Sequence, residues 1–142
     1  MRTLSLALTL SLAASAQASV VGIWKSDCQN VMDGQVRSIA PVDTFRSDGT
    51  ASLKVIGYSD LNCQGNIVLE QTYECTYRLG NLIPDLGDAR ELDLECRYEN
   101  EVNFWFDLAL VDSNTLHFGN ETGLTPESRP KVVGNIAYRR QF

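Results

Sequence analysis

The residues of this sequence that could carry out chemistry are four cysteines, one histidine and 18 carboxylates in a chain of 142 residues. The cysteines are Cys28, Cys63, Cys75 and Cys96, and no two of them have the Cys-x-x-Cys spacing of zinc sites. An even number of cysteines in a small exported domain is typical of disulfides. The sequence therefore predicts two disulfides and no free thiol.

The single histidine gives little support for catalysis. His117 alternates with Leu116 and Phe118, so a strand would place its imidazole on the face opposite these two apolar side chains. The sequence has no Gly-x-Ser-x-Gly elbow, no His-Glu-x-x-His motif and no glycine-rich phosphate loop. We therefore expect a protein that is not an enzyme, with no catalytic residue and no cofactor.

The carboxylates do not predict a metal site, because no segment has the spacing of an EF-hand calcium loop. Asp93 and Asp107 are expected to face each other on the outer side of a hairpin, where Arg78 can offset their repulsion. Solvent-exposed surface is the better interpretation of such a pair. The formal net charge of -6 argues against a nucleic-acid partner, because phosphate binding needs clustered Lys and Arg.

The first 18 residues predict a secretory signal peptide. Arg2 precedes an apolar run at residues 4–14, and Ala16-Gln17-Ala18 supplies the small residues of a cleavage site. The apolar run has about half the length of a membrane-spanning helix, and no later stretch comes closer to it. We expect a signal peptide at 1–18, one domain at 19–142, a periplasmic or extracellular location and no transmembrane segment.

Two alternating segments, residues 66–79 and 90–98, fit together as one antiparallel hairpin. In the register that sets Cys75 opposite Cys96, apolar residues pair on one face and opposite charges pair on the other. The pairs are Leu79 with Leu92, Tyr77 with Leu94, Tyr73 with Tyr98, Arg78 with Asp93 and Glu74 with Arg97. Because a shift of one residue would destroy every agreement, we predict a Cys75–Cys96 disulfide, which leaves Cys28 and Cys63 for the second.

Further alternating segments extend this hairpin into a meander. After a polar break at 99–101, the apolar phase continues if Cys96 lies opposite Phe104 and Leu94 opposite Phe106, with Trp105 on the outer face. Other strands are predicted at residues 22–25, 42–47, 50–58, 115–118 and 131–141. The pattern predicts an all-β fold, a single up-and-down antiparallel β-barrel of about eight strands. Closure is favoured over a flattened sandwich because it removes exposed strand edges.

The inner face of this barrel is aromatic and forms the candidate ligand site. Its members are Tyr73, Tyr77, Tyr98, Phe104 and Phe106. Their rings would surround an apolar ligand, and the tyrosine hydroxyls would give it polar contacts. The alternative is that the same side chains simply fill the barrel. The long connection at 119–130, in which Pro126 and Pro130 flank Arg129, is expected near the mouth and adds Arg129 to the candidate ligand-binding residues.

The start of the domain resembles the lipocalins. Gly22-Ile23-Trp24 is similar to the Gly-x-Trp signature on the first strand of lipocalins and of the wider calycin group. The resemblance implies structural roles for Gly22, Trp24 and Arg140. Trp24 would plug the closed end of the barrel, and a basic side chain from near the last strand would cover it, Arg140 first and Arg139 second.

A longer segment resembles the adenomatosis-polyposis-coli-down-regulated domain, and small exported bacterial proteins have a similar pattern. The matching skeleton is W-x-S-x-C from Trp24 to Cys28, followed by Y-x-D-x-x-C from Tyr58 to Cys63. This resemblance implies a lipocalin-like barrel with a Cys28–Cys63 bridge. It also implies that the activity is the binding of a hydrophobic group.

Two functions remain open at this stage. The leading hypothesis is an exported, non-enzymatic binding protein that holds a small hydrophobic ligand or an acyl chain inside the barrel. The alternative is a protein–protein interaction module with a filled barrel, similar in architecture to periplasmic inhibitors of secreted metalloproteases, which insert a free N-terminus. Here Ser19-Val20-Val21 would be that stub. The sequence does not indicate a protein partner.

Overall fold

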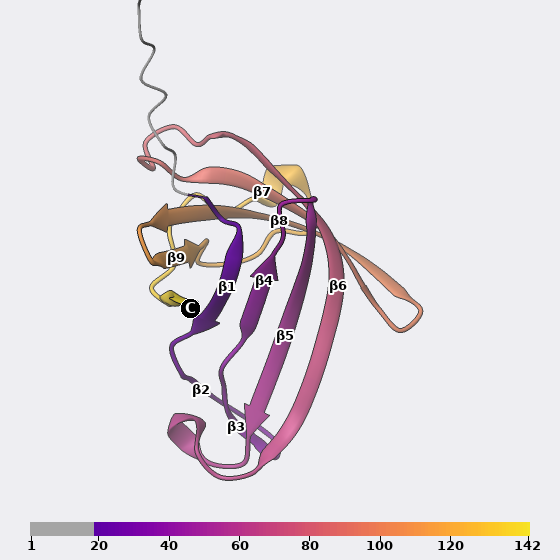
Figure 1. Ribbon diagram of the computed structural model, residues 1–142. Coiled ribbons are helices and arrows are strands. Elements are labelled where there is room, and N and C mark those ends of the chain that lie inside the picture. The colour runs from indigo at the N-terminus through magenta and orange to yellow at the C-terminus, as the bar shows by residue number, and fades with distance from the viewer. Residues whose placement is uncertain (1–18) are drawn as a thin grey trace, which may run out of the picture.

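The computed structural model describes residues 19–142, so the predicted signal peptide at 1–18 lies outside the described residues. The described residues form ten β-strands and two short 3₁₀ helices (Figure 1). The strands are β1 (Gly22–Ser26), β2 (Gln29–Asp33), β3 (Val36–Ile39), β4 (Val42–Phe45), β5 (Thr50–Tyr58), β6 (Ile67–Leu82), β7 (Arg90–Tyr98), β8 (Glu101–Asp112), β9 (Thr115–Phe118) and β10 (Tyr138–Gln141). The 3₁₀ helices are η1 (Leu61–Cys63) and η2 (Pro126–Ser128).

Eight of these strands close into an up-and-down antiparallel barrel. Around the ring the order is β1, β4, β5, β6, β7, β8, β9 and β10, and β10 pairs with β1 to complete it. Figure 1 shows β1, β4, β5 and β6 forming one wall, with β8 and β9 crossing behind it. The predicted all-β barrel is therefore confirmed. Closure leaves no open strand edge in the ring.

The hairpin of β2 and β3 lies outside the ring and was not predicted from the sequence. β3 pairs with the far end of β5, beyond the point where the wall breaks at Ala40 and Pro41. Most side chains of β2 are exposed, so this segment lacks the apolar alternation that marks the barrel strands. The Cys28–Cys63 disulfide and a hydrogen bond from the backbone nitrogen of Asn62 to Asn30 Oδ1, 2.9 Å long, hold this hairpin against η1.

The register of the first predicted hairpin and both disulfides are confirmed. β6 and β7 pair with Cys75 opposite Cys96, Tyr77 opposite Leu94 and Arg78 opposite Asp93. Cys75 bonds Cys96 and Cys28 bonds Cys63, so the described residues contain no free cysteine.

The predicted register of the next hairpin is wrong by one residue. Asn103 lies opposite Cys96, Trp105 opposite Leu94 and Asp107 opposite Leu92. The cause is the turn: Tyr98 pairs with Glu101, so only two residues connect β7 to β8, and the first of them, Glu99, has a left-handed φ of 53°. Trp105 and Asp107 therefore face the barrel interior, whereas Phe104 and Phe106 face outward.

The final predicted strand at 131–141 is also wrong in extent, because only Tyr138–Gln141 forms β10. The segment before it folds back along the end of β9, where the backbone nitrogen of Gly134 donates to the Phe118 carbonyl at 2.8 Å. A Cβ atom at Gly119 would overlap Pro130, and one at Gly134 would lie 3.0 Å from the Gly119 carbonyl oxygen. These two glycines permit a backbone approach that a regular strand does not make.

Trp24 fills one part of the barrel interior. Its side chain is fully buried, and its indole nitrogen donates to the Val20 carbonyl at 2.7 Å. The Arg140 guanidinium lies 4.2 Å from the ring centroid and donates to the Val21 carbonyl at 2.8 Å. Gly22 makes room for this contact, because a Cβ there would lie 2.6 Å from Arg140 Nη1. Arg140 therefore covers Trp24, as the resemblance to lipocalins implies, whereas Arg139 pairs with Asp27 at 2.9 Å.

Candidate functional site

The barrel interior contains a partly open cavity of about 320 Å³, which we call the inner chamber. Seven barrel strands, β4 to β10, contribute residues to its wall, and two further residues lie outside the strands. The lining residues are Pro41, Asp43, Phe45, Leu53, Val55, Tyr73, Leu94, Trp105, Asp107, Phe118, Thr122 and Tyr138. The wall is mostly apolar and aromatic, which is typical of sites for small molecules.

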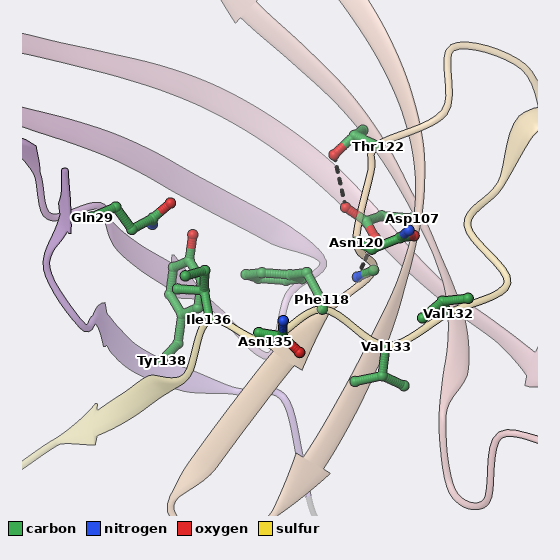
Figure 2. Close-up of a pocket in the computed structure, with 12 residues that line it drawn as sticks. Gln29, Asp107, Phe118, Asn120, Thr122, Val132, Val133, Asn135, Ile136 and Tyr138 are labelled. Atoms are coloured by element: carbon green, nitrogen blue, oxygen red, sulfur yellow. Dashed lines mark hydrogen bonds between the residues drawn. The ribbon is translucent and has the colours of Figure 1, made fainter. Parts of the chain in front are cut away.

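A second, more polar cavity of about 600 Å³ adjoins the inner chamber, and we call it the vestibule. The two cavities share Asp107, Phe118, Thr122 and Tyr138 as lining residues. The rest of the vestibule comes from Gln29 of β2 and from the segment between β9 and β10, including Asn120 and Asn135 (Figure 2). The connection predicted near the mouth, 119–130, gives Gly119, Asn120 and Thr122 to the vestibule wall, and residues 132–136, predicted as part of the last strand, supply a larger share.

Aromatic rings in mutual contact build the wall of the inner chamber. Tyr73 meets Trp105 edge to face with ring centroids 5.2 Å apart, and Phe118 meets Tyr138 edge to face at 4.8 Å. Phe45 lies 6.4 Å from Phe118 in a tilted arrangement. Edge-to-face contacts fix ring orientation, so the chamber has a preformed shape.

Asp43 is the unusual residue of the chamber. β4 alternates, and its inward positions are Asp43 and Phe45, which are 6% and 1% exposed. Within residues 19–142 the Asp43 carboxylate has no hydrogen-bond or ion-pair partner. Burial alone raises its pKa from the ordinary 3.8 to about 7. A buried carboxylate without a partner is costly, so this position has a reason other than packing.

Asp107 is the second carboxylate of the site, and in contrast to Asp43 it is fully partnered. One carboxylate oxygen accepts from the backbone nitrogens of Leu108 and Gly119, each at 2.8 Å, and the other accepts from Thr122 Oγ1 at 2.9 Å (Figure 2). Burial raises the pKa of Asp107, and these hydrogen bonds and the charge of Arg129 oppose the rise. Asp107 thus fastens the start of the segment after β9 to β8.

Tyr138 separates the inner chamber from the vestibule. In Figure 2 its hydroxyl points toward Gln29, and its ring lies beside Phe118. Burial raises the pKa of Tyr138, and the negative charge of Asp43 raises it further. The phenol is therefore neutral at physiological pH and offers a polar contact without adding charge.

The site has a negative electrostatic character. Asp43 and Asp107 line it, and no Lys, Arg or His occurs among the described residues that line either cavity. Arg129, which the sequence predicted as a ligand-binding residue, makes its contacts outside the cavities. Its guanidinium lies 2.6 Å from Asp93 and donates to the Asp107 backbone carbonyl at 2.7 Å. It also lies over the outward ring of Phe106, at 5.7 Å from the centroid. Arg129 clamps the segment to the barrel wall and does not line the chamber.

The structure brings together only part of the predicted ligand site. Tyr73 lines the inner chamber. Tyr98 packs against Tyr73 at 5.4 Å, and Tyr77 packs against Phe45 at 5.1 Å while its hydroxyl donates to the Arg46 carbonyl. Phe104 and Phe106 lie on the outer face, and the Phe104 side chain is 56% exposed. The one-residue error in register therefore removes both phenylalanines from the site.

The sequence argument missed Asp43, Trp105 and Asp107. Asp43 precedes the predicted inward residue Phe45 by two positions, so the same alternation that placed Phe45 inside also places Asp43 inside. A carboxylate in phase with buried aromatic residues was the available signal. Trp105 and Asp107 carried no such signal, because their placement depended on the length of the preceding turn.

Compared with known proteins, the chain matches no protein-family model, and no curated protein sequence matches it. Within residues 19–142, no helix has the length and apolar character needed to cross a membrane. The same residues contain no group of three or more His, Cys, Asp or Glu side chains placed to hold a metal ion. His117 lies on β9 and contacts the Gly134 carbonyl oxygen through Nδ1 at 3.0 Å.

Proposed function

We propose that this protein is a non-enzymatic binding protein that holds a small, largely apolar ligand in the inner chamber. The observation that carries the proposal is the closed barrel around a chamber of about 320 Å³ with a preformed aromatic wall. Cavities of this volume accommodate small organic molecules. The vestibule gives the ligand a polar entrance through Gln29, Asn120 and Asn135.

The proposed location is outside the cytoplasm, in the periplasm or the medium. Two disulfides staple a domain of modest size, and such bonds persist in oxidising compartments. The expected signal peptide supports the same location.

The alternative, a filled barrel that inserts Ser19-Val20-Val21 into a partner, has weaker support. Val20 is 2% exposed, and its carbonyl accepts from the Trp24 indole nitrogen. Arg140 also holds the backbone on both sides of Val20, at the carbonyls of Ser19 and Val21. Val20 therefore belongs to the packed interior, whereas Ser19 and Val21 are exposed and held against the barrel by Arg140.

Native mass spectrometry of protein purified from an oxidising compartment tests the proposal. We expect a mass excess that disappears when the same sample is denatured, because the chamber retains its ligand through purification. Uptake of the neutral apolar dye N-phenyl-1-naphthylamine provides a second readout for protein that has lost its ligand. A bare mass together with absent dye uptake would contradict the proposal and favour a filled barrel.

A pair of variants locates the bound molecule. Val55→Trp fills the inner chamber, which Val55 lines, and should abolish dye uptake. Val68→Trp is the matched control, because Val68 is 41% exposed on the neighbouring strand β6 and should leave uptake unchanged. Circular dichroism verifies that both variants keep the β-barrel. Equal uptake by both variants would place the ligand elsewhere.

A further inference from the structure

The inner chamber contains a carboxyl group that no basic residue among residues 19–142 neutralises. Asp43 is more than nine-tenths buried, lines the chamber and has no hydrogen-bond or ion-pair partner within residues 19–142. Buried carboxylates are normally hydrogen-bonded or paired, because desolvation of the charge costs several kcal/mol. Asp43 lines the cavity with its acceptor oxygens unused by the protein, so it can pair with a group that enters the chamber.

The second carboxylate makes the same region more negative without being available as a partner. Asp107 already accepts three hydrogen bonds, from Leu108, Gly119 and Thr122. Its charge therefore contributes to the field of the cavity, whereas Asp43 retains free acceptor capacity. No basic residue lines the inner chamber or the vestibule in the part of the chain that the structure describes.

The aromatic wall has the right chemistry for a cation. The rings of Phe45, Tyr73, Trp105, Phe118 and Tyr138 surround the same cavity as Asp43. The faces of aromatic rings carry partial negative charge and attract ammonium groups, most strongly when the pair is shielded from water. A carboxylate together with such rings recognises an amine that also has an apolar body.

We infer that the ligand of the inner chamber is a small organic cation, a primary to quaternary amine with an apolar body, whose charged group pairs with Asp43. The inference rests on the proposed function, because it specifies the ligand class of the same chamber. Fatty acids and other acyl anions are the wrong charge for a cavity lined by two carboxylates and no base. The vestibule would hold any polar part of the cation through its amide side chains.

Protonation of Asp43 gives the inference a pH dependence. The titratable groups that face the same chamber are Asp107 from β8, Tyr138 from β10 and Tyr73 from β6, and none of them is basic. Since Asp43 has a pKa of about 7 when the chamber is empty, a cation binds best above that pH and displaces the carboxyl proton below it. Binding at pH 6 should therefore release a proton to the buffer.

A matched set of three probes tests the charge preference. They are 3-phenylpropylamine, 3-phenylpropanol and 3-phenylpropanoate, which share an apolar body and differ in charge. Isothermal titration calorimetry at pH 8 should show the amine binding about tenfold or more tightly than the alcohol, because charge-assisted contacts are worth more than neutral ones. The anion should bind weakest. At pH 6, the apparent enthalpy of amine binding should vary with the ionisation enthalpy of the buffer, which reports proton release from the native protein.

Two variants connect that preference to the residue. Asp43→Asn should lose the advantage of the amine over the alcohol while it keeps alcohol binding, and Asp88→Asn in the exposed β6–β7 loop is the matched control. An amine and an alcohol that bind equally in the native protein, or an anion that binds tightest, would overturn the cation inference and leave the proposed function standing. If none of the three probes binds, the proposed function and this inference fall together.

Discussion

The barrel interior contains two neighbouring regions that differ in whether their polar side chains have partners. Trp24 and Asp43 lie opposite each other on the paired strands β1 and β4, and both side chains are buried. Around Trp24 both polar groups have partners. The indole nitrogen donates to a backbone carbonyl, and the Arg140 guanidinium donates to another carbonyl and lies over the indole ring. Beside it, Asp43 has a cavity and no partner.

The difference distinguishes the Trp24 cluster, which stabilises the fold, from Asp43, which lines the proposed ligand site. A satisfied polar cluster that fills its space stabilises the barrel, and its removal leaves a hole or an orphaned charge. An unsatisfied carboxylate on a preformed cavity lowers stability, and folds tolerate such groups mainly at functional positions. The stabilising cluster and the proposed ligand site therefore lie on one pair of adjacent strands, β1 and β4.

The largest effect is expected when the filled region is emptied. Trp24→Ala removes a fully buried ring and the partner of Arg140, so it should lower the free energy of unfolding by about 3–5 kcal/mol. Urea denaturation followed by circular dichroism measures this loss. Arg140→Met keeps most of the packing and should cost about 1–2 kcal/mol. If Trp24→Ala costs no more than Arg140→Met, the region is not the packed anchor described above.

An effect of comparable size and opposite sign is expected at Asp43. Its pKa rises from 3.8 in the unfolded chain to about 7 in the barrel, so the folded state binds more protons between these values, and stability falls as the pH rises from about 4 to 7. Asp43→Asn removes this loss and should stabilise the empty barrel by up to about 4 kcal/mol at pH 8, with little change at pH 4. Urea midpoints at both pH values measure it.

The surface variant Asp88→Asn is the control for that experiment and should give a nearly constant difference across the same pH range. An Asp43→Asn variant that is destabilised at pH 8 would show that its carboxylate has an internal partner. That outcome would remove the contrast between the two regions.

The smallest effect is expected on the outer face of β8. Phe104→Ala should change the free energy of unfolding by less than about 0.5 kcal/mol, because the ring is largely exposed, and it should leave dye uptake intact. Trp105→Ala changes the adjacent residue, which lines the chamber, and should alter uptake. Reversed results for this pair would favour the register that the apolar alternation predicts over the observed one.

These two aromatic neighbours also illustrate what the sequence could predict. The pairing of β6 with β7 was accessible because the apolar face, the charge pairs and two cysteines all favoured one register. Along β8 both phases are apolar: Phe104, Phe106 and Leu108 alternate with Trp105, Ala109 and Val111. The pattern favoured the first, more hydrophobic phase as the inner one, because the second also contains Asn103 and Asp107, and the first phase proved to face outward.

Leu108 shows why the outer phase is so apolar. It is fully buried although it shares the outward phase of Phe104, and its neighbour Phe106 pairs through its backbone with Gly123. Arg129 covers the Phe106 ring from the same connecting segment. Part of the apolar outer face of β8 is therefore covered by the connecting segment. In the sequence, such covered positions look like core positions. Contacts made by an irregular segment leave no periodic signal.

The closure of the barrel between β1 and β10 has a consequence for the order of folding. Arg140 and Val21, which meet at this seam, are separated by 119 positions, whereas the hairpins of β6, β7 and β8 join near neighbours. Loop-closure entropy makes such distant contacts late and local hairpins early. The Cys75–Cys96 bond can therefore lock a partly formed sheet while the first and last strands still expose their edges. During that interval the chain is most open to aggregation, and the seam between β1 and β10 ends it.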